Sequence, residues 1–116
     1  MYFHNLEKLF QSITKAGYHI DVIHAHSFFC AGVAATRLGT KYGIPVVVTE
    51  HSSAIISKKL DNQKCDLLKE TVENCDQFIC VGKGLKNAVI EYTKTVRDII
   101  VIPNMVDKIF RYTEEM

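Results

Sequence analysis

The sequence predicts an open, doubly wound α/β domain on a parallel sheet of about four strands. Its 116 residues, 47% hydrophobic and 23% charged, have the composition of one ordinary globular domain. Short apolar segments alternate along the chain with amphipathic segments of about 10 to 15 residues, which is typical of βαβ units. The apolar segments carry hydrophobic residues at consecutive positions, as buried parallel strands do.

We expect the chain to open with an amphipathic helix over residues 5–17. Leu6, Phe10 and Ile13 recur at helical spacing, and Gly17 is a natural end for the helix. A strand should follow over residues 19–25, with apolar residues on both of its faces. Nothing before it could pair with it, and an unpaired sheet edge promotes aggregation. The pattern therefore predicts either further sequence before this helix or self-association through the uncovered edge.

Ser27 is expected to cap a second helix over residues 28–43, which ends at Gly43. The next strand, "IPVVVTE", covers residues 44–50 and has apolar residues at consecutive positions. This pattern indicates a strand covered on both faces, and hence a central position in the sheet.

The second half of the chain continues the alternation of helices and strands, and no repeat or linker interrupts it. The elements expected there are an irregular polar loop over 52–64, a helix over 65–75, a strand over 77–81, a helix over 84–94 and a strand over 98–102. All four strands should be parallel and adjacent in chain order, because helical connections join them. No element is assigned to residues 105–116.

Charge and hydropathy exclude several classes of function. Fourteen Lys and Arg against thirteen Asp and Glu give a net charge of +1, which does not favour nucleic-acid binding. The apolar runs fall short of the roughly 18 residues that a membrane span needs, and the first ten residues do not resemble a signal peptide. We therefore expect a cytoplasmic protein. The four cysteines show no C-x-x-C pair, so we expect reduced, buried thiols.

Polar side chains begin where each expected strand ends. The four strand ends deliver residues 24–27, 49–53, 82–84 and 103–104. Ligands of open parallel sheets bind beyond the carboxyl ends of the strands, so these groups should meet at one edge. The candidate site residues at this edge are His26, Glu50, His51, Ser52, Ser53, Gly82, Lys83 and Asn104.

Two other interpretations of these residues stay open at this point. His24 and His26 face the same side of their strand and, with Glu50 and His51, could form the metal site of a hydrolase. The alternative, which we favour, is a hydrogen-bonded, partly buried His24 and a His26 at the strand end, with no metal. Likewise, the glycines beside Lys83 could bind an anion at a helix start or simply form a turn.

Three segments in this order resemble family 4 glycosyltransferases, which are retaining enzymes of the two-domain GT-B type. They are "DVIHAHS", "IPVVVTEHSS" and "VIPNMVD", and the resemblance covers about residues 17–110. It implies that residues 1–116 form part of a Rossmann-like domain, the second half of the N-terminal, acceptor-side domain. The Glu-x7-Glu pair of the donor-binding domain has no counterpart, since no two glutamates here stand eight apart. We therefore expect a fragment without the donor-binding domain, inactive alone.

The resemblance also implies roles for individual residues. The family's cleft histidine, which contacts the donor sugar, corresponds to His51, while Ser52 and Ser53 would shape the acceptor side. Asn104 would lie on the cleft rim. Two positions depart from the family pattern: Gly82 stands where serine is frequent, which puts a polar contact in doubt, and Met105 stands where glycine is frequent, which puts a tight turn in doubt.

The substrates and partners that the resemblance implies are a nucleotide-diphosphate sugar as donor and a carbohydrate or lipid as acceptor. It implies no cofactor, because transfer is metal-independent, and it implies peripheral membrane association of the full enzyme. The competing hypothesis is a non-catalytic α/β binding or interaction module, and the metal-dependent hydrolase is the third.

Overall fold

The computed structural model describes residues 2–57 and 60–105. Within them, the strands form one parallel sheet in the order β1-β2-β3-β4. The strands are β1 (Ile23–His26), β2 (Val46–Glu50), β3 (Gln77–Cys80) and β4 (Ile100–Val101). The α/β fold with a parallel sheet in chain order is thereby confirmed.

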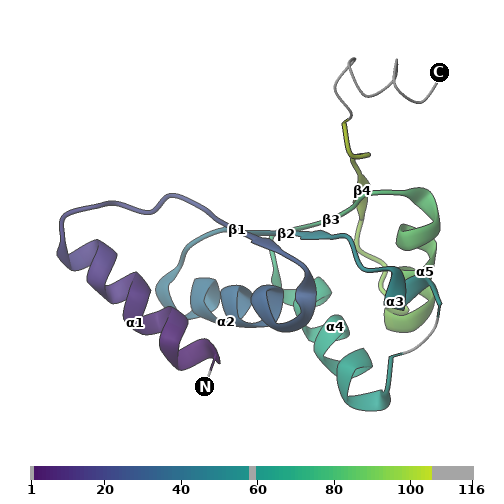
Figure 1. Ribbon diagram of the computed structural model, residues 1–116, viewed down its shortest axis with the longest axis horizontal. Coiled ribbons are helices and arrows are strands. Elements are labelled where there is room, and N and C mark those ends of the chain that lie inside the picture. Colours follow the sequence, from purple (N-terminus) through teal and green to yellow (C-terminus); the bar gives the residue numbers. More distant parts are fainter. Residues whose placement is uncertain (1, 58–59, 106–116) are drawn as a thin grey trace, which may run out of the picture.

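The helical elements lie on one side of this sheet (Figure 1). They are α1 (Tyr2–Lys15), the π-helical segment η1 (Phe28–Gly32), α2 (Val33–Tyr42), α3 (Ser53–Ile56), α4 (Asn62–Asn74) and α5 (Lys83–Thr93). Right-handed crossovers that always step to the next strand in one direction place their helices on the same face. Among the described residues the strand order does not reverse, so the expected cover on both faces of β2 is not met there.

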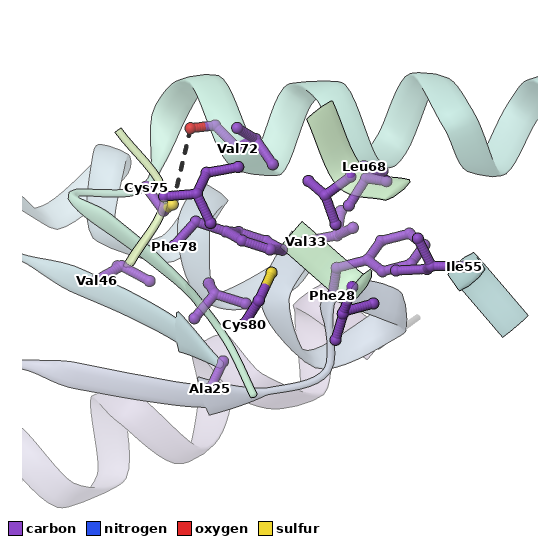
Figure 2. Close-up of a cluster of buried hydrophobic side chains, with 14 of the residues drawn as sticks. Ala25, Phe28, Val33, Val46, Ile55, Leu68, Val72, Cys75, Phe78 and Cys80 are labelled. Atoms are coloured by element: carbon purple, nitrogen blue, oxygen red, sulfur yellow. Dashed lines mark hydrogen bonds between the residues drawn. The ribbon is translucent and has the colours of Figure 1, made fainter. Parts of the chain in front are cut away.

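The core fills the space between the sheet and its helices (Figure 2). Phe78 and Cys80 of β3 pack against Leu68 and Val72 of α4 in one buried cluster. The opposite face of the sheet is more open: Val47 is half-buried and the histidines of β1 are exposed. The two faces of the sheet therefore differ, although the sequence of β2 is apolar on both.

Most helix ends lie where capping residues in the sequence predict them. Gly17 and Gly43 adopt φ values of 99° and 69° where α1 and α2 end, as glycine allows. The helix expected from residue 65 begins earlier, at Asn62, because the Asp61 side chain accepts a hydrogen bond from the Lys64 N–H at 2.8 Å.

The irregular loop expected over residues 52–64 is wrong for part of its length. The short helix α3 lies within it, and Ile55 of this helix is fully buried in the core. Residues 58–59 of the expected loop lie outside the described residues.

The expected cap at Ser27 is also wrong. Ser27 adopts φ 72° and ψ 137° and its side chain makes no capping hydrogen bond, while α2 itself begins at Val33. The N–H of Phe28 instead donates to Oε2 of Glu50 at 2.7 Å. A carboxylate at the end of β2 thus binds the first N–H of this helical segment, whereas a serine cap would accept an N–H one or two residues further on.

Strand lengths are set by pairing. β1 begins at Ile23, later than expected, where its pairing with Val46, the first residue of β2, begins. β4 has two residues, Ile100 and Val101, which pair with the end of β3. None of the described helices is long and apolar enough to cross a membrane.

The expectation of buried thiols holds for two of the four cysteines, while Cys30 and Cys65 are half-buried. All four are free thiols, and Cys75 and Cys80 are buried. Burial raises the pKa of Cys75 to about 11 and that of Cys80 to about 12. Both thiols therefore stay protonated at neutral pH and act as small hydrophobic side chains.

Candidate functional site at the ends of β1 and β2

The candidate site lies where β1 and β2 end side by side. His26 is the last residue of β1 and is paired in register with Thr49, while Glu50 is the last residue of β2. Successive strand residues point to opposite faces. His24 and His26 therefore project to the open face, and Glu50 projects to the face that the helices cover.

Three imidazoles, which we call the histidine row (His24, His26 and His51), follow one another across the open face. The ring centroids of His24 and His26 are 4.4 Å apart, and those of His26 and His51 are 5.5 Å apart. Nδ1 of His26 lies 3.3 Å from Nε2 of His51. At the other end of the row, Nε2 of His24 lies 2.8 Å from Oγ1 of Thr49. The sequence predicted a hydrogen-bonded, partly buried His24. This contact provides the bond and covers part of the ring, while the residue as a whole is exposed.

The environment of the histidine row disfavours positive charge on His24. Partial burial lowers the pKa of His24 below its usual value, and the adjacent imidazoles of His26 and His51 lower it further. At neutral pH the ring of His24 is therefore neutral, and its contact with Thr49 is a neutral hydrogen bond.

Glu50 lies beneath the row and is fully buried. Its Oε1 accepts hydrogen bonds from the N–H groups of His51 at 3.1 Å and Ser52 at 2.9 Å, and its Oε2 accepts the N–H of Phe28. One carboxylate thus joins the chain leaving β1 to the chain leaving β2. The structure places this predicted site residue under the site, with its oxygens occupied by the backbone.

Ser52 is half-buried, and its Oγ accepts the N–H of Ala54 at 3.2 Å at the start of α3. Ser53 is the first residue of α3. Gly82 and the exposed Lys83 start α5 with no side-chain cap, and Asn104 is exposed beyond β4. The structure thus brings His26, Glu50, His51 and Ser52 together, whereas no hydrogen bond joins Gly82, Lys83 or Asn104 to them within the described residues.

The metal-site interpretation does not fit this geometry. Among the described residues, no three His, Cys, Asp or Glu side chains are arranged to hold one metal ion. Glu50 turns away from the histidines to bind backbone N–H groups, so the proposed His and Glu ligands do not converge. The described residues therefore do not support the ligand set His24, His26, Glu50 and His51 that the metal-dependent hydrolase would need.

Two functional features escaped the sequence analysis. Thr49 orients His24 from the neighbouring strand, and the alternation of β2, which places Thr49 on the same face as His24 and His26, could have indicated this. The backbone of Ser27, with φ 72° and ψ 137°, has no comparable signal, because glycine would be the usual residue there. Unusual backbone conformations of this kind concentrate at functional sites.

Comparison with known proteins adds two findings. The model of the family described as Glycosyltransferase Family 4 matches residues 2–108. An uncharacterized glycosyltransferase of Methanocaldococcus jannaschii is 36% identical over 95 residues, which amount to 82% of this chain and 26% of that protein. The chain thus spans about a quarter of the length of this relative.

Proposed function

The chain belongs to glycosyltransferase family 4, and we propose that it forms the second half of the N-terminal, acceptor-side domain of a longer enzyme. That enzyme, of the GT-B type, transfers a sugar from a nucleotide-diphosphate donor to a carbohydrate or lipid acceptor and retains the anomeric configuration. Two findings support this proposal: the family model matches residues 2–108, and the chain spans about a quarter of the length of the similar glycosyltransferase.

The observation that carries the proposal is the position of His51. It directly follows the buried strand β2, and its N–H is held by the carboxylate of Glu50 at 3.1 Å. Its ring is exposed and contacts His26. A rigid backbone with an exposed imidazole at the carboxyl edge of a sheet is well suited to meet a ligand there.

His51 would act by hydrogen bonding to the donor sugar. The reaction leaves negative charge on the departing diphosphate, so groups that are already oriented stabilise the transition state without reorganising. Ser52 and Ser53 would shape the acceptor side, and Asn104 would line the rim of the cleft. Lys83, at the start of α5, where no side chain of the described residues caps the helix, would add positive potential near the same edge.

The test compares His51→Ala with His19→Ala in the full-length protein that contains this chain. Release of nucleoside diphosphate from UDP-, GDP- and ADP-linked hexoses measures turnover. We expect His51→Ala to lower turnover about 100- to 1,000-fold, the usual cost of losing such a hydrogen bond. His19 is a matched control because it is exposed and paired with Asp21 at 2.9 Å, away from the histidine row. Turnover of His51→Ala within threefold of wild type, about the size of an exposed side-chain effect, would contradict the proposal.

One observation favours the second candidate, a binding module. β1 is an edge strand of the described sheet, and the face that carries the histidine row is uncovered. An uncovered sheet edge promotes self-association, which light scattering on the isolated chain measures.

The fragment proposal also predicts that the isolated chain transfers no sugar. Measurable turnover by the isolated chain would contradict this proposal.

A further inference from the structure

The contact between His26 and His51 has a chemical requirement. Nδ1 of His26 and Nε2 of His51 are 3.3 Å apart, so one nitrogen must carry a proton and the other must offer a lone pair. The hydrogen bond at one ring nitrogen decides which nitrogen of a neutral imidazole is protonated. The protonation pattern of His51 is therefore tied to that of His26.

His26 is itself held in place from two directions. The centroid of its ring lies 4.4 Å from that of His24, and the His24 ring is held by its hydrogen bond with Thr49. The backbone next to His26 is fixed as well, because the N–H of Ser27 donates to the carbonyl oxygen of Thr49 at 2.7 Å. An exposed histidine would otherwise rotate between several rotamers. His26 is thus a fixed point against which the exposed ring of His51 can be oriented.

We propose that His26 is a positioning residue that occupies Nε2 of His51, so that His51 meets the donor sugar through Nδ1. This inference rests on the proposed function of His51. Nδ1 of His51 makes no hydrogen bond within the described residues, so it is the nitrogen left for a ligand. His26 acts through His51 and does not need to touch the substrate.

The variants His26→Asn and His26→Phe separate this positioning role from simple packing. The amide of asparagine places a hydrogen-bonding atom near the position of Nδ1, whereas phenylalanine keeps a planar ring against His24 and removes the hydrogen bond. Since His26 is exposed, neither variant should prevent folding. His19→Phe serves as the control for the loss of an exposed imidazole elsewhere.

The first measurement needs no substrate. Long-range proton–nitrogen NMR spectra of the imidazole rings of the full-length protein that contains this chain report which nitrogen of His51 carries the proton. We expect one dominant tautomer of His51 in the wild-type protein and a mixture in His26→Phe. In His26→Asn the amide can present either its oxygen or its NH2, so Nε2 of His51 stays hydrogen-bonded in either tautomer. An unchanged His51 spectrum in His26→Phe would overturn the proposal.

The second measurement is turnover of the full-length protein with the same nucleotide sugars. We expect His26→Phe to lose about two- to tenfold in kcat, which is the effect of one neutral hydrogen bond, and His26→Asn to recover most of it. Equal turnover of His26→Phe and wild type would overturn the positioning role. Normal turnover of His51→Ala would instead refute the proposed function, and with it the role of Nδ1, and the NMR result would still report on the pairing.

Discussion

Replacing Glu50 by glutamine tests whether this carboxylate holds the two strand ends together. Glutamine has the same shape, so it leaves no cavity, but it offers one acceptor oxygen where glutamate offers two. If that oxygen keeps the N–H groups of His51 and Ser52, the amide NH2 must face the N–H of Phe28, which now lies 2.7 Å from Oε2. Two donors then oppose each other in a buried position.

The expected loss of stability follows from these three bonds. A buried N–H without a partner costs about 1–3 kcal/mol, and the two remaining bonds lose the extra strength that a charged acceptor gives, about 1 kcal/mol each. Neutralising a fully buried charge offsets part of this cost. We therefore expect Glu50→Gln to lower the free energy of unfolding by about 2 kcal/mol.

Urea unfolding followed by circular dichroism measures this change. With a urea dependence of about 1–3 kcal/mol per molar, the midpoint should fall by roughly 1 M. Glu73→Gln on α4 is the matched control, because Glu73 is exposed and the same substitution there should shift the midpoint by less than about 0.3 M. Hydrogen exchange should also accelerate at the N–H of Phe28. A Glu50→Gln midpoint equal to that of wild type would refute the assignment of Glu50 as the link between the two strand ends.

Three further substitutions or conditions have expected outcomes. Gly39→Ala should destabilise by at least about 2 kcal/mol in the same urea assay, because its Cβ would lie 2.5 Å from the carbonyl oxygen of Ile44, whereas Gly84→Ala in open space should not. Ser27→Gly should raise the melting temperature, since glycine relieves a φ of 72° that costs about 1–3 kcal/mol and no capping bond is lost; a lower melting temperature would contradict this. The lowered pKa of His24 means that the unfolded chain binds this proton more tightly, so stability should fall as pH drops below about 6.5. The fall should be smaller in His24→Asn, and equal pH profiles of the two proteins would show that His24 does not contribute.

The sequence by itself determined the order of elements and the direction of the strands. Apolar runs separated by helical segments leave few alternatives to right-handed crossovers and a parallel sheet, and the sheet in chain order agrees with this. It also placed His26 and His51 at neighbouring strand ends, because parallel strands end at the same edge. Local caps such as Gly17 and Gly43 were readable for the same reason: the residue type meets a backbone requirement at its own position.

Only the tertiary structure decided how the site residues are used. Side-chain alternation turns Glu50 toward the core and the histidines of β1 toward the open face. A shift of one residue along the strand would reverse these faces, and the apolar run of β2 does not reveal which face is which. The carboxylate then binds the N–H of Phe28, which is 22 positions away in the sequence, and Ser27 does not take the capping role that the local pattern predicted. The contact between His26 and His51 spans 25 positions and depends on two rings meeting across a strand pair. Such contacts depend on register and rotamer together, and neither is encoded in a short stretch of sequence.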